Sequence, residues 1–293
     1  MPEFNALQLG GKDAQDNAGN REWWEANPMI YDWDHKLGDV TLTPDYFSGI
    51  DEIFGSGHSL INNPRWPNGA ILENFIPYKK FAGKNVLEVG CGAGLVASYI
   101  ARAGGNLAAI DLTEQAVRIT RQRFEQAGLQ GDIRQMDAEH LEFDDESFDY
   151  IVSWGVIHHS GNMQAILDEI YRVLRPGGQA YLMVYNRNSL RYQIYCRFWL
   201  GVMRGRFLRQ NLPEIVGSIT DGHIARHLDT GEFRSMASHF SKAEFSFSDE
   251  KLTILKYLFG VGAPFRPFSR QTHPFEQWLA RRWGWYLEAT LTK

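Results

Sequence analysis

The stretch from Lys84 to Gly105 places three glycines within five positions, directly after a short apolar run. Gly90, Gly92 and Gly94 allow a tight turn and a close approach of the backbone to a ligand. A glutamate, Glu88, lies inside the apolar run just before this loop. Because glycine loops at the start of a helix usually bind anions, the acidic neighbour indicates a different kind of ligand.

Charge and spacing choose among the ligands of such loops. The spacing is G-x-G-x-G, which differs from the G-x-G-x-x-G of dinucleotide-binding proteins, and no Lys-Ser or Lys-Thr of a phosphate-binding loop follows. Glu88 would repel a pyrophosphate, and residues 86–101 contain no basic side chain. A ligand with a sulfonium, an ammonium group and an adenosine suits the loop. The sequence therefore favours S-adenosylmethionine and its product S-adenosylhomocysteine over a nicotinamide dinucleotide.

Two further carboxylates end apolar segments, Asp111 at the end of 106–111 and Asp137 at the end of 132–137. An acidic residue after the second strand of a nucleotide-binding fold can accept both ribose hydroxyls, and we expect this of Asp111. We expect Asp137 to accept a hydrogen bond from the adenine amino group. The alternative for either residue is a capping or turn carboxylate, although Thr113 is available to cap the helix after Asp111.

The adjacent histidines of "SWGVIHHS" are candidates for proton removal from a methyl acceptor. Methyl transfer from a sulfonium is an in-line displacement that requires alignment, exclusion of water and, for a hydroxyl acceptor, a base. Histidine suits this role near neutral pH. His158 is the preferred catalytic candidate, followed by His159, and the alternative is that they only pack the turn.

Four residues are candidates for contact with the acceptor. Tyr185 and Arg187 lie at the end of the fifth apolar segment, where Arg187 suits a carboxylate or phosphate unless it is a solvent-facing charge. Tyr31 and Trp33, in "NPMIYDWD", are expected beside the sulfonium, where an aromatic face is electrostatically favourable. Their alternative role is to fasten the N-terminal segment to the sheet.

No metal site is predicted. His223 and His227 are four positions apart and are expected to share a helix face, but two histidines without a third ligand make a poor metal site. The two cysteines, Cys91 and Cys196, follow neither metal-ligand nor disulfide spacing. Cys91 is interpreted as a small packing residue.

Apolar strand-like segments alternate with amphipathic helix-like segments in the middle of the chain, which predicts an α/β fold with a parallel sheet and helices on both faces. The segments that read as strands are 85–89, 106–111, 132–137, 147–154 and 179–185, and those that read as helices include 113–128 and 162–174.

Four stretches carry a family resemblance: "VLEVGCGAG", "AAIDLT", "QMDAEHLEFDDESFDYIVSWGVIHH" and "EIYRVLRPGGQAYLMVY". In order and spacing they resemble successive motifs of the class I S-adenosylmethionine-dependent methyltransferases, over roughly residues 80–186. Within this superfamily the chain is similar to the broad group that includes ubiquinone-pathway and small-molecule methyltransferases.

The resemblance implies a Rossmann-like, seven-stranded, mostly parallel sheet whose last strand, within 283–293, is antiparallel. It places Asp111 with Leu112 at the ribose and Asp137 with Ala138 beside adenine. It also places Ser153 and Trp154 at the end of the fourth strand. The residues that it implies at the methionine part are Glu88, Gly90, Gly92 and Gly94.

The flanks of the core are expected to close the site. We divide the chain into an N-terminal lid (1–75), a cofactor-binding core (76–190), a substrate-cap insertion with a late strand (191–282) and a final core strand (283–293). Aromatic residues gather at 21–34 and 191–210. The arginines of the second stretch are interpreted as a solvated helix face in preference to a membrane contact; they are Arg197, Arg204, Arg206 and Arg209.

Composition limits the function classes. The net charge of −5 argues against a nucleic-acid-binding protein. The two cysteines without disulfide spacing favour a reducing, cytoplasmic setting. The N-terminus lacks an apolar signal region, and no uninterrupted apolar run in the sequence is long enough to span a bilayer. We predict an enzyme that methylates an oxygen or nitrogen of a small-molecule acceptor. The alternatives are a quinone or lipid acceptor, a non-catalytic S-adenosylmethionine-binding protein and an NAD-dependent oxidoreductase.

Overall fold

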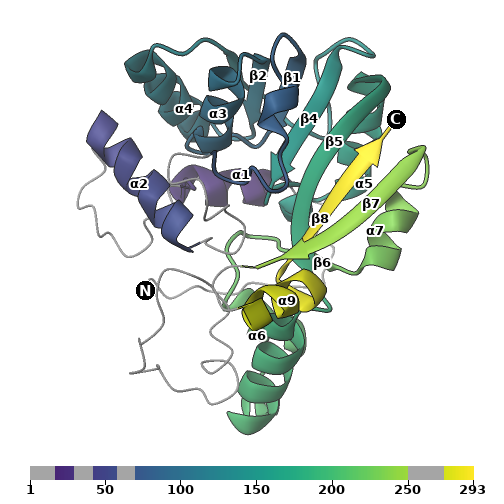
Figure 1. The fold of residues 1–293 in the computed structure, drawn as a ribbon. Helices are drawn as coiled ribbons and strands as arrows, with labels where there is room; N and C mark the ends of the chain where they lie inside the picture. Colours follow the sequence, from purple (N-terminus) through teal and green to yellow (C-terminus); the bar gives the residue numbers. More distant parts are fainter. Residues whose placement is uncertain (1–16, 30–41, 58–69, 250–273) are drawn as a thin grey trace.

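The computed structural model describes residues 17–29, 42–57, 70–249 and 274–293. Its centre is one mixed sheet (Figure 1). The strands are β1 (Asn85–Val89), β2 (Asn106–Asp111), β3 (Asp132–Gln135), β4 (Phe148–Trp154), β5 (Leu174–Asn186), β6 (His227–Leu228), β7 (Lys242–Ser248) and β8 (Tyr286–Thr292).

The strand order in the sheet is β3-β2-β1-β4-β5-β8-β7, and the two-residue β6 pairs with β5 outside this path. Strands β1 to β5 pair in parallel, whereas β8 is antiparallel to both β5 and β7. The predicted mostly parallel sheet with an antiparallel last strand is confirmed. The order reverses beside β1, so the end of β1 is where a ligand crevice is expected in a fold of this kind.

Helices cover both faces of the sheet. They are α1 (Asn17–Ala26), α2 (Pro44–Gly57), α3 (Leu95–Arg102), α4 (Glu114–Ala127), α5 (Met163–Val173), α6 (Leu212–Gly217), α7 (Thr230–Met236) and α9 (Pro274–Trp283). Shorter or differently wound helices are η2 (Tyr78–Lys80), η3 (Ile157–His159), η4 (Arg191–Met203) and η5 (Arg206–Leu208). Of these, η4 is a π-helix and the others are 3₁₀ helices.

The side chains of β1 point alternately to the two faces of the sheet, and the apolar core is accordingly divided into two clusters. Val86 belongs to the apolar cluster that includes Val96 and Ile100 of α3, whereas Leu87 and Val89 belong to the cluster that includes α5. Successive side chains of a strand point to opposite faces, so Glu88 lies on the same face as Val86. The residue pattern of the strand thus directs one carboxylate into the α3 side of an otherwise apolar core.

Several boundaries differ from those predicted. β3 ends at Gln135, so Asp137 lies in the following loop, and β5 already begins at Leu174, with an irregular register opposite Phe148. The predicted helix through His223 and His227 is wrong, because the chain bends without helical structure at 221–226 and His227 begins β6.

Candidate functional site

A cavity of about 670 Å³ lies at the carboxyl ends of β1, β2 and β4. Of the residues predicted at the cofactor, those that line it are Glu88, Gly90, Gly92, Asp111, Leu112, Ala138 and Trp154. His159 and Tyr185 line it as well. Gly94, Asp137, Ser153, His158 and Arg187 are not among its lining residues, and Tyr31 and Trp33 lie outside the described residues.

The glycine loop is shaped by its neighbours as much as by any ligand. Gly90 has φ +80°, and a Cβ there would lie 2.3 Å from the side chain of Val156. Gly94 has φ +74°, is the N-cap of α3, and would bring a Cβ within 2.9 Å of Thr120. Both positions require glycine because the left-handed conformation and the packing exclude a side chain. Gly94 therefore serves the entry into α3.

Glu88 is a buried carboxylate without full compensation. It is 3% exposed, and its Oε2 has no hydrogen-bond partner in the structure. Burial raises the pKa of Glu88 well above its usual value, and the nearby charge of Asp111 raises it further. An ionised carboxylate in such a place is stabilised by a cation. The orphaned oxygen at the cavity wall therefore fits the cationic methionine end of S-adenosylmethionine.

Asp111 joins β2 to the glycine loop. Its Oδ2 accepts a hydrogen bond from the Gly92 N–H at 3.0 Å, and its Oδ1 accepts from the N–H and Oγ of Thr113 at 3.0 and 2.9 Å. Thr113 also caps α4 by accepting from the Ala116 N–H. The expectation that Thr113 leaves Asp111 free is wrong, since Thr113 itself contacts the carboxylate. A carboxylate has about four acceptor sites, so one remains for a ligand hydroxyl.

The loop after β3 carries Ala138 to the cavity wall. The carboxylate of Asp137 accepts hydrogen bonds from Asn17 Nδ2 at 3.2 Å and from the Glu139 N–H at 2.9 Å. Asp137 thus has the contacts of a turn carboxylate, which was the alternative to its predicted role at the adenine. Its bond to Asn17 also ties α1 to this loop. The neighbouring Ala138 lines the cavity.

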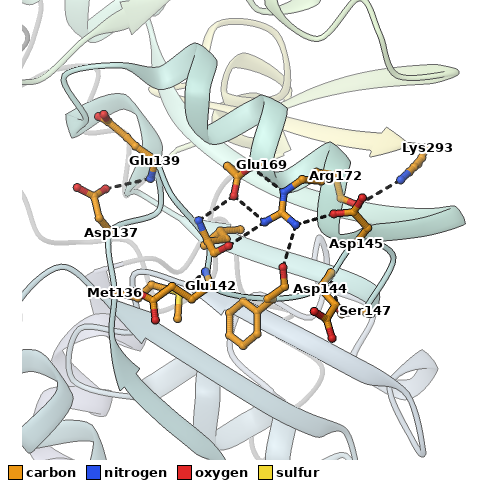
Figure 2. Close-up of polar contacts among 12 residues, drawn as sticks. Met136, Asp137, Glu139, Glu142, Asp144, Asp145, Ser147, Glu169, Arg172 and Lys293 are labelled. Carbon is orange, nitrogen blue, oxygen red and sulfur yellow. Dashed lines mark hydrogen bonds and ion pairs between the residues drawn. The ribbon is translucent and has the colours of Figure 1, made fainter.

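Arg172 of α5 holds the rest of this loop in place, as Figure 2 shows. Its guanidinium donates to the carbonyls of Leu141 and Phe143, both at 2.8 Å, and pairs with Asp145 at 2.7 Å and Glu169 at 2.8 Å. These carboxylates raise the pKa of Arg172, so the side chain stays charged. Arg172, together with Glu169, which accepts from the Leu141 N–H at 2.8 Å, therefore fixes the path of residues 141–145, between Ala138 and β4.

The two histidines of η3 have different environments. His159 lines the cavity, and its Nδ1 lies 2.5 Å from the carbonyl oxygen of Ile224. A carbonyl only accepts, so Nδ1 carries the proton and Nε2 keeps a lone pair, which has no partner in the structure. Burial lowers the pKa of His159, although the charge of Asp221 partly opposes this.

His158 is not among the residues that line the cavity. It is fully buried, neither ring nitrogen has a partner, and its ring lies 4.2 Å from those of His159 and Tyr185. Burial lowers the pKa of His158 well below its usual value. The preference for His158 over His159 is therefore not supported by their placement.

The outer part of the cavity has aromatic walls and one acidic group. Trp154, Trp285 and Tyr286 line it, and the Tyr185 hydroxyl donates to Asp221 Oδ1 at 2.7 Å. The guanidinium of Arg191 lies 4.7 Å over the Trp285 ring. Sequence reasoning missed Asp221 because no motif contains it. Trp285 and Tyr286 were expected only as parts of the last strand, within 283–293, and not as residues of the site.

The remaining candidates have structural partners. Arg187 pairs with Asp229 at 2.6 Å and Glu232 at 2.8 Å, which leaves its charge engaged outside the cavity. The Ser153 hydroxyl donates to the Val89 carbonyl and joins β4 to β1. Burial raises the pKa of the Cys91 thiol, which fits a packing residue.

The described residues lack both a metal-ligand cluster and a membrane-spanning helix. No group of three or more His, Cys, Asp or Glu side chains is arranged to hold a metal ion in this part of the chain. Among the helices that the structure describes, none is both long and apolar enough to cross a membrane.

Comparisons with known proteins agree with this geometry. Residues 87–182 match the model of a methyltransferase domain family. The ubiquinone biosynthesis O-methyltransferase of Pseudomonas aeruginosa (strain UCBPP-PA14) is 32% identical over 133 residues, which cover 45% of this chain and 55% of that protein. The probable phthiotriol/phenolphthiotriol dimycocerosates methyltransferase 2 of Mycobacterium ulcerans (strain Agy99) is 43% identical over 99 residues, 33% of this chain and 38% of that protein. The chain thus spans about half the length, or less, of these curated relatives.

Solved structures share the fold. The crystal structure of an S-adenosylmethionine-dependent methyltransferase from Archaeoglobus fulgidus aligns with a TM-score of 0.51 at 13% identity, over 76% of this chain and 91% of that chain. Together, the matched domain at residues 87–182 and the strand order make this part of the chain similar to the class I S-adenosylmethionine-dependent methyltransferases.

Proposed function

We propose that the protein transfers the methyl group of S-adenosylmethionine to an oxygen or nitrogen of a small-molecule acceptor. The observation that carries the proposal is that one cavity is lined by both groups of residues. We call the part with Glu88 and Asp111, at the ends of β1 and β2, the inner wall, and the part with Asp221 and His159 the outer wall. Its volume of about 670 Å³ lies within the usual range of small-molecule sites, roughly 300–1,000 Å³.

The inner wall would hold the cofactor. Glu88 would attract the cationic methionine end, Asp111 would accept from a ribose hydroxyl, and Leu112 and Ala138 would flank the adenine. When bound, S-adenosylmethionine supplies an electrophilic methyl group attached to its sulfonium. The product S-adenosylhomocysteine would use the same residues.

The outer wall would position the acceptor and receive its proton. We assign the base to His159, which lines the cavity, has an Nε2 without a hydrogen-bond partner and has a lowered pKa that keeps it neutral near pH 7. Asp221 would stabilise the imidazolium that forms, and the Tyr185 hydroxyl holds Asp221 in position at 2.7 Å. His158 would support the ring of His159 by packing.

A quinone, phenol or lipid acceptor is the second candidate, favoured by the aromatic outer wall. Two relatives are named for ubiquinone biosynthesis and for phthiotriol/phenolphthiotriol dimycocerosates. Trp154, Trp285 and Tyr286 offer flat apolar faces, which suit an aromatic ring better than a highly charged metabolite.

The flanking segments would close the cavity over the acceptor. Trp24 and Met29 line it from the proposed N-terminal lid (1–75), and Arg191, Tyr195 and Asp221 line it from the proposed cap (191–282). This supports the division of the chain into a core (76–190, completed by 283–293) and two roofing segments. A cytoplasmic location without a nucleic-acid partner remains part of the proposal.

Calorimetry tests the proposal before any acceptor is known. We expect S-adenosylmethionine and S-adenosylhomocysteine to bind and NAD not to bind, because Glu88 repels a pyrophosphate. Asp111→Ala should weaken S-adenosylmethionine binding by about 1.5–3 kcal/mol, the cost of hydrogen bonds to a charged group. Micromolar NAD binding without a response to S-adenosylmethionine would refute the proposal, and an unchanged affinity of the variant would limit Asp111 to closing the loop.

A further inference from the structure

Exposed apolar side chains are concentrated on two helical segments. Within the described residues, every large hydrophobic side chain that is exposed lies either on η4 and η5 or on α9. Those on η4 and η5 are Phe198, Val202, Met203, Phe207 and Leu208, and those on α9 are Phe275 and Trp278. Leu208 is 89% exposed and Met203 58%. The five on η4 and η5 lie within eleven consecutive residues, and such a concentration marks an interaction site, whereas isolated exposed hydrophobics are ordinary.

The winding of η4 separates an inner face from an outer face. Its buried residues are Tyr192, Cys196 and Gly201, at intervals of four and five positions. These intervals suit a π-helix, whose i→i+5 hydrogen bonds give a wider turn than that of an α-helix. The exposed residues Phe198 and Met203 are also five positions apart. The outer face is therefore a consequence of regular winding around a buried inner face.

The apolar turn that follows η4 is held firmly. A Cβ on Gly201 would lie 2.3 Å from the Phe207 ring, so the absence of a side chain there lets η5 pack back on η4. Arg206 donates to Gln210 at 2.6 Å and to Ser218 at 3.0 Å. Leu208 is thus presented to solvent on an anchored turn.

The charge of this surface is opposite to that of the whole protein. Residues 191–209 contain five arginines and no acidic residue, whereas the chain carries a net charge of −5. Arg197, Arg204 and Arg209 are exposed beside the apolar residues. Arg281 and Arg282 are likewise exposed on α9. Large apolar side chains next to arginines are the composition of helices that lie in the interface of an anionic bilayer.

The two segments are neighbours. Leu190, the residue before η4, packs against Leu279 and Ala280 of α9. Figure 1 shows η4 as the green helix at the bottom of the view, beyond the end of the sheet. From the same helix, Arg191 and Tyr195 reach the cavity wall. One end of η4 therefore belongs to the cavity, while its outer face is turned to solvent.

We infer that η4, η5 and α9 form a surface that docks on anionic phospholipid bilayers. The apolar residues Phe198, Met203 and Leu208 enter the headgroup region, and the exposed arginines contact lipid phosphates. The sequence-based interpretation of these arginines as an ordinary solvated face does not account for the apolar residues exposed among them. Docking here does not depend on the identity of the methyl acceptor or on methyl transfer.

Vesicle co-sedimentation tests the inference. The full chain should sediment with vesicles of phosphatidylcholine and phosphatidylglycerol in equal parts, and binding should fall with phosphatidylcholine alone or at high salt. Phe198→Ser with Leu208→Ser, and separately Arg197→Gln with Arg204→Gln and Arg209→Gln, should each lower the partition coefficient by at least about ten-fold. Trp278→Ser should lower it as well, because α9 is part of the surface.

Matched controls separate docking from unfolding and from general charge effects. Arg118→Gln with Arg134→Gln removes exposed arginines outside this surface and should leave vesicle binding unchanged. Unchanged S-adenosylmethionine affinity or unchanged circular dichroism shows that a surface variant is folded. The inference is overturned if the native chain does not sediment with anionic vesicles, or if the surface variants sediment as it does. It is also overturned if these residues mediate self-association, seen as a concentration-dependent dimer that the Phe198 and Leu208 changes abolish while vesicle binding persists.

Discussion

At the scale of single residues, Glu88 is a buried carboxylate that costs stability and that we propose as a cofactor-binding residue. Its carboxylate is buried, has one orphaned oxygen and has a raised pKa, so its ionised form is unfavourable in the empty protein. The sequence identified Glu88 from its position before the glycine loop, and the structure shows why that position matters. The same charge that disfavours the free protein would attract a cationic ligand.

Glu88→Gln should therefore stabilise the free protein and weaken its ligand. Without ligand at neutral pH we expect the thermal midpoint to rise by about 2–4 °C, equivalent to roughly 1 kcal/mol for a protein of this size. The affinity for S-adenosylmethionine should fall at least about ten-fold. Thermal unfolding and calorimetry measure the two effects. Glu288→Gln, at a buried carboxylate paired with two serines of β7, is the control that should leave affinity unchanged. A lower midpoint with unchanged affinity would assign Glu88 a structural role.

The two adjacent histidines should separate in kinetics. His159→Ala should lower turnover by about 10²–10⁴-fold with little change in cofactor affinity, whereas His158→Ala should give a smaller loss. The neutral base is lost as pH falls through its lowered pKa, so the acidic limb of kcat/KM should lie below pH 6.5. Turnover of both variants with an acceptor found by screening phenols and amines checks this. Near-normal turnover of His159→Ala would remove histidine from the mechanism and leave positioning as the main source of rate.

At the scale of elements, the loop between β3 and β4 is held by two side chains of α5, Arg172 and Glu169. Arg172 bonds to two carbonyls and two carboxylates of this region (Figure 2). The chain has no regular secondary structure between Met136 and Ser147 to hold Ala138 in place. The rigidity of this side of the cavity is therefore supplied from α5.

Arg172→Met should loosen the loop without unfolding the sheet. We expect a loss of about 1–2 kcal/mol in the free energy of unfolding, because the guanidinium is partly exposed and its ion pairs are screened by water. Hydrogen exchange should accelerate at 138–147, and S-adenosylmethionine should bind more weakly. The control is Arg118→Met, at an exposed position of α4, where the guanidinium donates to Gln115. It should change neither hydrogen exchange at 138–147 nor S-adenosylmethionine affinity. Unchanged exchange in Arg172→Met would show that packing alone holds the loop.

At the scale of the whole molecule, a buried histidine cluster links stability to pH. His158, His159 and His227 surround Tyr185, and burial lowers the pKa of each, to about 3 for His227. The unfolded chain binds protons at these histidines below about pH 6.5, whereas the folded protein does not, so they destabilise it as pH falls. Glu88 and Asp111 oppose this trend, because carboxylates with raised pKa take up protons earlier in the folded state.

His158→Phe isolates one member of this cluster. Neither nitrogen of His158 has a partner, so an apolar ring of similar shape should leave the free energy of unfolding at pH 7 within about 1.5 kcal/mol of its original value. Between pH 6.5 and about pH 5 the variant should lose less stability than the native chain, by up to about 1.4 kcal/mol per pH unit. Denaturant titrations across this range check it, with His140→Gln at an exposed position as the control. Identical slopes in both proteins would contradict the linkage.

The sequence by itself determined the alternating core, the parallel strands and the acidic glycine loop. These follow from periodicity along β1 and β2 and from residues only a few positions apart, such as Thr113 capping α4. Such features are set by interactions between near neighbours in the chain, which a pattern of residue types records. For the same reason, most residues predicted at the cofactor line the cavity at the ends of β1, β2 and β4, although their role in binding stays a prediction.

Only the tertiary structure decided which of the candidate acceptor-binding side chains line the cavity. Tyr185 contacts Asp221, 36 positions away, so this predicted acceptor-binding residue has an acidic partner. Arg187 pairs with Asp229, 42 positions away, so its charge is not available to a substrate. His158 and His159 are identical in type and adjacent in sequence, yet only His159 is among the residues that line the cavity, while His158 is fully buried beside it. These outcomes depend on how the segment after η4 returns to the sheet. Contacts between residues far apart in the sequence leave no periodic pattern in it. Their partners are brought together only when the whole chain packs.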